Sequence, residues 1–170
     1  WEDGLGKELT SGFGEQKGMK LANTYQHLFP IGYQDHTPEK VAVDDIRHIE
    51  ALRREKDQEK LAVSLHTAGL PENLASLRIF RRASAMHLSE IMPILEKMGL
   101  YAHEERRNAV EIEGKTIWVH DFTVQAPADA TRAIDDEVVV ARITNAIQLA
   151  WANEIEIDSL NSLITHGNLG

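Results

Sequence analysis

The chain has 170 residues, no cysteine and a net charge of −9, from 27 acidic and 18 basic side chains. The lack of cysteine excludes disulfides, thiolate metal sites and cysteine nucleophiles. The negative charge repels phosphate backbones and anionic lipid heads, so neither nucleic acid nor a membrane is expected as a partner. These features predict a cytoplasmic protein. The start at Trp1, without an initiator methionine, suggests a piece cut from a longer chain.

A helical segment is expected over residues 1–58. Apolar residues recur every fourth position at the start, as on one side of an amphipathic helix. A second helical pattern is stopped by Pro30, and Thr37-Pro38 is typical of an N-cap followed by proline at the first helical position. The expected helices span about 3–16, 19–29 and 37–60, with a connection at 31–36.

The period of the apolar pattern changes after residue 60. Alternating residues predict strands, and a stripe at helical spacing that ends at Gly99 predicts the best-defined helix. The expected strand at 116–125 has apolar or aromatic residues on both faces, which is typical of a central strand. The expected strands span about 61–66, 74–82, 100–112 and 116–125, and the expected helices span 87–99 and 131–152.

This order of elements predicts an α+β fold. A ferredoxin-like βαββαβ unit whose last strand is moved to the front gives the string strand, strand, helix, strand, strand, helix. The expected architecture is an ACT-like, ferredoxin-like four-stranded antiparallel sheet with two helices on one face, permuted and preceded by N-terminal helices. Another two-layer α+β topology stays open. The domain prediction is a helical segment at 1–58, an ACT-like domain at 59–153, and a segment at 154–170 with a short helix from Asp158.

No catalytic, cofactor or metal site is predicted. Gly12, Gly14 and Gly18 have the wrong spacing for a nucleotide-binding loop and are interpreted as helix ends. The eight histidines form no pair with a carboxylate at helical ligand spacing. His120 and Asp121 are adjacent on a strand and therefore point to opposite faces, so they are not expected to form a base with its orienting acid.

Four residues are candidates for an effector site or an interface: Arg106, Arg107, Trp118 and His120. The two arginines belong to the cluster Glu104 to Arg107, where solvated pairing between neighbouring strands is the simpler interpretation. The alternative is that one arginine binds the carboxylate of an effector. His120 is interpreted as packed beside Trp118 on one face of its strand.

Several blocks of the sequence resemble, in order and spacing, the large bacterial NAD-specific glutamate dehydrogenases. The resemblance covers nearly the whole chain, with departures at Arg107-Asn108 and Ala152-Asn153. The blocks are LSEIMPILEKMGL (Leu88 to Leu100), EER (Glu104 to Arg106), WVHDF (Trp118 to Phe122) and WANEIEIDSLNSL (Trp151 to Leu163), and in front of them Trp1-Glu2-Asp3, Tyr25 to Tyr33 with Phe29-Pro30, Asp45-Ile46 and Ile49-Glu50.

The resemblance implies a multidomain, homo-oligomeric enzyme that converts L-glutamate to 2-oxoglutarate with NAD. It implies that ACT-like domains lie ahead of the catalytic domain, and no catalytic residue of the family matches a position here. The expected function is a non-catalytic regulatory or architectural domain whose partners are the other domains of the parent enzyme. Two alternatives stay open: an amino-acid-sensing module that binds an amino-acid effector, and a stand-alone ferredoxin-like interaction domain.

Overall fold

A computed structural model of the chain describes residues 1–67, 69–71, 73–126 and 136–153. The expected short helix from Asp158, the segment 154–170 and the start of the expected helix 131–152 lie outside these residues. The elements, in chain order, are α1 (Glu2–Phe13), α2 (Glu15–Tyr25), α3 (Ile31–His36), α4 (Glu39–Arg54), β1 (Ala62–His66), β2 (Leu74–Arg82), α5 (Leu88–Lys97), β3 (Tyr101–Ile112), β4 (Lys115–Gln125) and α6 (Glu137–Trp151).

The four strands form one antiparallel sheet in the order β1-β2-β4-β3. In an unpermuted ferredoxin-like sheet, the last strand of the chain lies beside the first. Here β1 lies beside β2 in that place, so the order is that of a ferredoxin-like sheet whose last strand has been moved to the front. The predicted α+β class and the permuted ACT-like sheet are therefore confirmed. The β3–β4 hairpin turns through Glu113 and Gly114, whose φ angles of 51° and 78° suit a two-residue turn that follows the twist of the strands.

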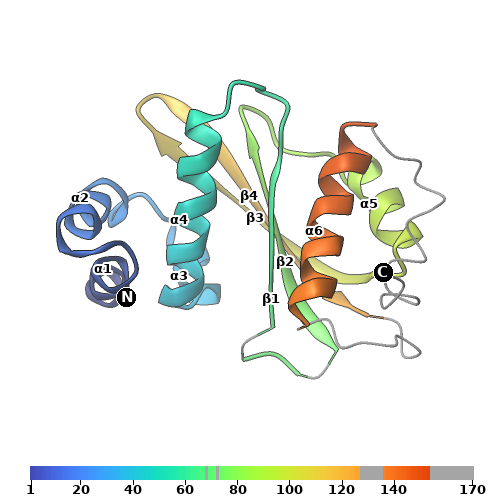
Figure 1. Ribbon diagram of the computed structural model, residues 1–170, viewed down its shortest axis with the longest axis horizontal. Coiled ribbons are helices and arrows are strands. Elements are labelled where there is room, and N and C mark those ends of the chain that lie inside the picture. Colours follow the sequence, from blue (N-terminus) through green and yellow to red (C-terminus); the bar gives the residue numbers. More distant parts are fainter. Residues whose placement is uncertain (68, 72, 127–135, 154–170) are drawn as a thin grey trace.

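Helices cover both faces of the sheet (Figure 1). The helices α5 and α6 pack on one face, as predicted, and α4 packs on the other. Through α4, the N-terminal helical segment contacts the sheet directly, which the sequence patterns do not indicate. The first core includes Leu77, Ile79, Ile91, Leu95, Phe122, Val124, Ile143 and Ile147. The second includes Leu5, Leu9, Tyr25, Tyr33, Ile46, Ile49, Phe80, Ile112, Ile117 and Val119.

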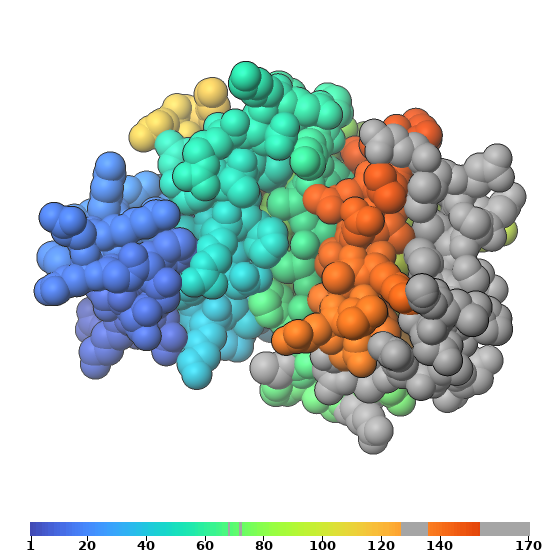
Figure 2. Space-filling model, viewed as in Figure 1, coloured from blue at the N-terminus to red at the C-terminus, as the bar shows by residue number. Residues whose placement is uncertain are grey.

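The first two helices extend the α4 layer at one end of the molecule. Figure 2 shows them as a block beside α4, and α1 contacts both α2 and α4. The prediction of a connection at 31–36 was wrong, because these residues form the short helix α3. Pro30, in an extended conformation, is its N-cap, and the Pro30 carbonyl accepts a hydrogen bond from the Gln34 amide at 3.1 Å. Because α2 already ends at Tyr25, the proline starts a helix and does not stop one.

Gly18 sets the distance between α1 and α2. A Cβ atom at this position would lie 2.5 Å from the Thr10 Cα, which is backbone and cannot move aside as a side chain can. We expect Gly18→Ala to lower the free energy of unfolding by about 1–3 kcal/mol through overpacking. The measurement is urea denaturation followed by circular dichroism.

Gly6→Ala is the matched control for this prediction. Gly6 also lies in a helix, and a Cβ atom there would meet nothing within 4 Å. Alanine should therefore be neutral or stabilising by up to about 1 kcal/mol, because it is the better helix former. Equal effects of the two substitutions would show that α1 and α2 do not pack closely at Gly18.

Candidate functional site

A buried ion pair joins α4 to the sheet. Arg78, on β2, is 2% exposed and Asp45, on α4, is fully buried. Arg78 Nε donates to Asp45 Oδ1 at 2.8 Å, and Arg78 Nη2 donates to Asp45 Oδ2 at 2.6 Å. Two parallel hydrogen bonds between a guanidinium and a carboxylate fix the relative orientation of the groups as well as their distance. The position of α4 on β2 is therefore set by this pair.

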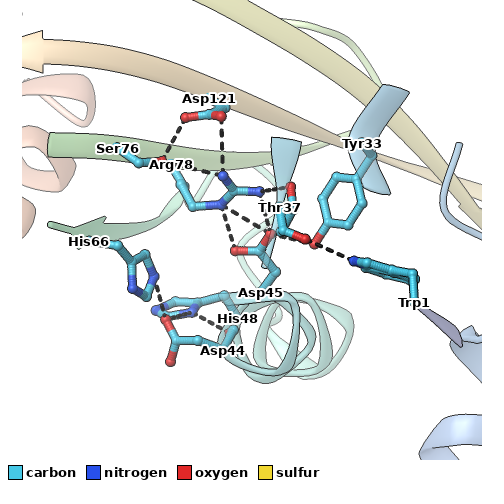
Figure 3. A network of polar contacts seen from close by, with 10 residues as sticks. All are labelled: Trp1, Tyr33, Thr37, Asp44, Asp45, His48, His66, Ser76, Arg78 and Asp121. Carbon is cyan, nitrogen blue, oxygen red and sulfur yellow. Dashed lines mark hydrogen bonds and ion pairs between the residues drawn. The ribbon is translucent and has the colours of Figure 1, made fainter. Parts of the chain in front are cut away.

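Polar side chains from two further elements, α3 and β4, and one more from β2 complete the network (Figure 3). The Tyr33 hydroxyl donates to Asp45 Oδ2 at 2.6 Å. On the other side of Arg78, Nη1 lies 3.3 Å from Asp121 Oδ2 on β4, and Ser76 donates to the other oxygen of that carboxylate at 2.7 Å. Buried charges are tolerated when they are paired and hydrogen-bonded in this way.

The spacing of the apolar residues in α4 and β2 explains why both charged residues lie on buried faces. Asp45 lies between Ala42 and Ile49 on the buried side of α4, at helical spacing from both. Arg78 is even-numbered in β2 and therefore shares a face with Phe80, which packs in the second core. Each charged residue lies on an otherwise apolar face, and the two residues contact each other across the interface.

Burial and charge determine which groups of the network are ionised. Burial raises the pKa of Tyr33 well above its usual value, and the Asp45 carboxylate raises it further, so Tyr33 stays a hydrogen-bond donor. Burial disfavours the guanidinium of Arg78, but Asp45 outweighs this and holds the pKa of Arg78 above its usual value. Arg78 is therefore a permanent cation that faces two carboxylates.

An aromatic group connects the N-terminal helices to the ion pair. The rings of Phe29 and Tyr33 stack at 4.3 Å, and Trp1 contacts both edge-on. The Trp1 Nε1–H donates to the Thr37 carbonyl at 2.8 Å, and the Arg78 guanidinium lies 5.7 Å from the centre of the Tyr33 ring. Such contacts each contribute about 0.5–1.5 kcal/mol beyond the area they bury. Trp1, the first residue of the chain, is thus packed close to the Arg78–Asp45 pair.

Asp44, next to Asp45, lies at a second contact between α4 and the sheet. Its Oδ2 is 3.1 Å from His66 Nε2 on β1 and 3.5 Å from His48 Nδ1 on α4. Partial burial raises the pKa of Asp44, but the two imidazoles outweigh it and the pKa is lowered. Across 1–67, 69–71, 73–126 and 136–153, no cluster of histidine and acidic side chains has the arrangement that a metal ion needs.

The four predicted candidates do not form one site. His120, Trp118 and Arg107 lie on the α5–α6 face, and Arg106 lies on the opposite face, because it pairs with Asp121 across the ladder. Each arginine binds a glutamate two residues earlier on its own strand: Arg106 binds Glu104 and Arg107 binds Glu105, both at 3.0 Å. Pairing within β3 replaces the expected pairing between strands.

His120 is a buried structural histidine. The Met86 amide donates to His120 Nε2 at 3.1 Å, so Nε2 is the acceptor and the Nδ1–H points to Glu105 Oε2 at 3.1 Å. Burial lowers the pKa of His120, although Glu105 opposes this. His120 stacks on Phe122, while the Trp118 indole donates to the Ala83 carbonyl at 3.3 Å. As expected, His120 does not pair with Asp121, which binds the buried network on the other face of the sheet.

Arg78, Asp45 and Tyr33 were missed in the prediction of site residues. A signal existed: Arg78 is a charged residue between Leu77 and Ile79 in a strand with two buried faces, and Asp45 lies on an apolar helix face. Neither pattern indicates which charged residues pair, because the partners are 33 positions apart.

Among the residues that the structure describes, every helix is too short or too polar to span a membrane.

These features define an α+β domain of the ACT type with a helical segment fixed to its second sheet face. Residues 60–137 match the family model described as the glutamate dehydrogenase ACT3 domain, and residues 8–52 match the one described as glutamate dehydrogenase, helical motif 2. The ion pair joins the two matched segments, because Asp45 lies in one and Arg78 in the other.

Similar proteins carry the same family name. NAD-specific glutamate dehydrogenases of Halomonas elongata and Pseudomonas aeruginosa are 29% and 25% identical to the chain over 99% of its length, and that of Mycobacterium tuberculosis is 28% identical over 89%. The chain spans about a tenth of the length of these curated relatives. It belongs to the large NAD-specific glutamate dehydrogenases and comprises a regulatory or architectural region of that family.

Arg78→Met tests the ion pair. The substitution leaves the Asp45 carboxylate buried without its main partner, and we expect the free energy of unfolding to fall by about 3–5 kcal/mol. Adding Asp45→Leu removes the second charge and should recover part of the loss. Urea denaturation of the single and double variants measures both effects.

Arg106→Gln is the matched control, because it removes an arginine from a partly exposed pair on the same sheet. It should change stability by less than about 1 kcal/mol. A loss for Arg78→Met as small as the control, or a double variant less stable than the single one, would contradict the role of the ion pair.

His120→Gln tests the buried imidazole. Because the folded state lowers the pKa of His120 below its usual 6.5, neutral His120 contributes stability above about pH 6.5 that is lost as the pH falls toward the lowered pKa. Glutamine keeps an acceptor and a donor but takes up no proton. The fall in unfolding free energy between pH 6.5 and pH 5 should be shallower in the variant by up to about 1.4 kcal/mol per pH unit. Identical pH slopes would contradict a neutral, buried His120; the matched control is His36→Gln, which removes an exposed imidazole.

Proposed function

We propose that the chain is a non-catalytic architectural or regulatory unit that holds a helical motif and an ACT-like sheet as one rigid body. The buried Arg78–Asp45 pair carries this proposal, because it fixes α4 on β2 through two charge-assisted hydrogen bonds. Removing either partner would leave a buried charge unpaired, which costs several kcal/mol. A relative movement of helix and sheet at this point is therefore disfavoured.

The parent protein is proposed to be a cytoplasmic, homo-oligomeric glutamate dehydrogenase with NAD as its cofactor. It would convert L-glutamate, NAD⁺ and water to 2-oxoglutarate, ammonium, NADH and a proton, as the name of the relatives suggests. NAD binding and hydride transfer are assigned to other parts of that protein, which would be the partners of this chain. The division at 1–58, 59–153 and 154–170 stays a prediction.

The arrangement of the candidate residues supports a role in holding structure. Arg106 and Arg107 point to opposite faces and each already binds a glutamate, so they do not converge on one ligand carboxylate. His120 has both ring nitrogens engaged, one by a backbone amide and one by Glu105. These side chains hold the sheet and the loop before α5 in place.

A dehydrogenase assay tests the absence of catalysis. The purified chain, incubated with L-glutamate and NAD⁺, should produce no NADH above the rate without protein. The full-length enzyme of Halomonas elongata, assayed in parallel, serves as the positive control. NADH formation by the chain that scales with its concentration would overturn the assignment of the chemistry to other parts of the parent protein.

A further inference from the structure

A cavity of about 590 Å³ opens between the end of α4, the end of β2 and the β3–β4 hairpin. We call it the hairpin cavity. Figure 1 shows the hairpin turn standing beside the C-terminal end of α4. Its volume lies in the range of roughly 300–1,000 Å³ that is typical of small-molecule sites. Its lining combines basic side chains with the apolar residues Ala83, Ile112 and Ile117.

The charge of the hairpin cavity is opposite to that of the chain. Three bases, Arg53, Arg82 and Lys115, line it together with one acid, Glu113, whereas the whole chain carries −9. A local excess of positive charge in a negative protein concentrates anions at that place.

Both arginines are held in place by other groups. Arg82 Nη1 donates to the carbonyls of Leu52 and Glu55 at 2.6 and 2.8 Å. Arg53 Nη1 donates to Glu50 at 2.7 Å. The hydrogen bond from Arg53 opposes the effect of partial burial and helps to lower the pKa of Glu50. Side chains that are already ordered lose little further freedom when a ligand binds.

Glu113 occupies Arg53 in the manner of a ligand. Its carboxylate lies 2.8 Å from Arg53 Nη2, but its side chain is 78% exposed and sits on the hairpin turn. An exposed pair of this kind contributes only about 0–1 kcal/mol, so another carboxylate can replace it at little cost. Arg53 would keep its contact with Glu50 during the exchange. The neighbouring Lys115 is exposed, and within the described residues no ion pair or hydrogen bond involves its ammonium group.

We propose that the hairpin cavity binds a small organic dicarboxylate. One carboxylate takes the place of Glu113 on Arg53, the second binds the Lys115 ammonium, and the short carbon chain between them lies against the apolar lining, where Ala83 is exposed and Ile112 and Ile117 are almost fully buried. This inference concerns residues that are separate from the Arg78–Asp45 network and does not depend on the proposed role of the chain.

Isothermal titration of the full chain with succinate tests the site. We expect saturable binding in the millimolar range or tighter, and Lys115→Gln should weaken it about tenfold by removing a charge-assisted hydrogen bond. Lys20→Gln, an exposed lysine on α2 with the same change of charge, should leave the affinity unchanged. Glu113→Gln should raise the affinity severalfold, because it removes the competing carboxylate, whereas Glu96→Gln, an exposed acid on α5, should not.

Three results would overturn the proposal. The first is the absence of saturable heat with millimolar succinate. The second is an equal loss of affinity in Lys115→Gln and Lys20→Gln, which would indicate general electrostatic attraction. The third is sulfate binding as tight as succinate binding, which would indicate an inorganic anion site rather than a dicarboxylate site. Thermal unfolding of each variant verifies that the exposed substitutions leave the fold intact.

Discussion

The structure depends on placing one arginine and one aspartate in an apolar interface at the same time. Arg78 and Asp45 come from segments 33 positions apart, and neither could stay charged and buried without the other. An apolar interface of α4 on the sheet could slide by a fraction of a helical turn with little loss. A bidentate pair with Tyr33 and Asp121 on its two sides permits one arrangement only. The ion pair thus trades some stability for a unique position of the helix.

The consequence is a sheet with two different faces. The α5–α6 face is almost wholly apolar in its core, and its polar group, His120, is neutral and satisfied by a backbone amide. The α4 face contains the charged network and its aromatic neighbours. The first face thus gains its stability mainly from apolar burial. The second fixes geometry, which suits a region that must hold one part of a long protein against another.

Local patterns predicted most of the fold. The strand 74–82 was predicted with its observed bounds, and β3, β4 and α5 were predicted to within a few residues, because alternation and helical spacing are properties of neighbouring residues. The order of the elements predicted a permuted ferredoxin-like arrangement, although it left the strand order itself open. The helix α3 was missed because Pro30 was interpreted only as a stop, although the same residue caps the next helix.

The candidate site could not be predicted in the same way. Pattern analysis assigns a residue to a face, but the pairing of Arg78 with Asp45 depends on which face of the sheet receives α4. The sequence therefore favours the clustered charges Arg106 and Arg107 as candidates for an effector site. In the structure, both bind glutamates on their own strand. A better indication of the site is a single charged residue on an apolar face. Burying such a charge is energetically costly unless a partner pairs with it.

Native-state hydrogen exchange tests most directly whether helix and sheet form one rigid unit. The amides of α4 and of β2 should show the same opening free energy, and both should fall by the same amount in Arg78→Met, since one ion pair holds both elements. Exchange of the α4 amides at a lower free energy than those of β2, unchanged by Arg78→Met, would contradict the account.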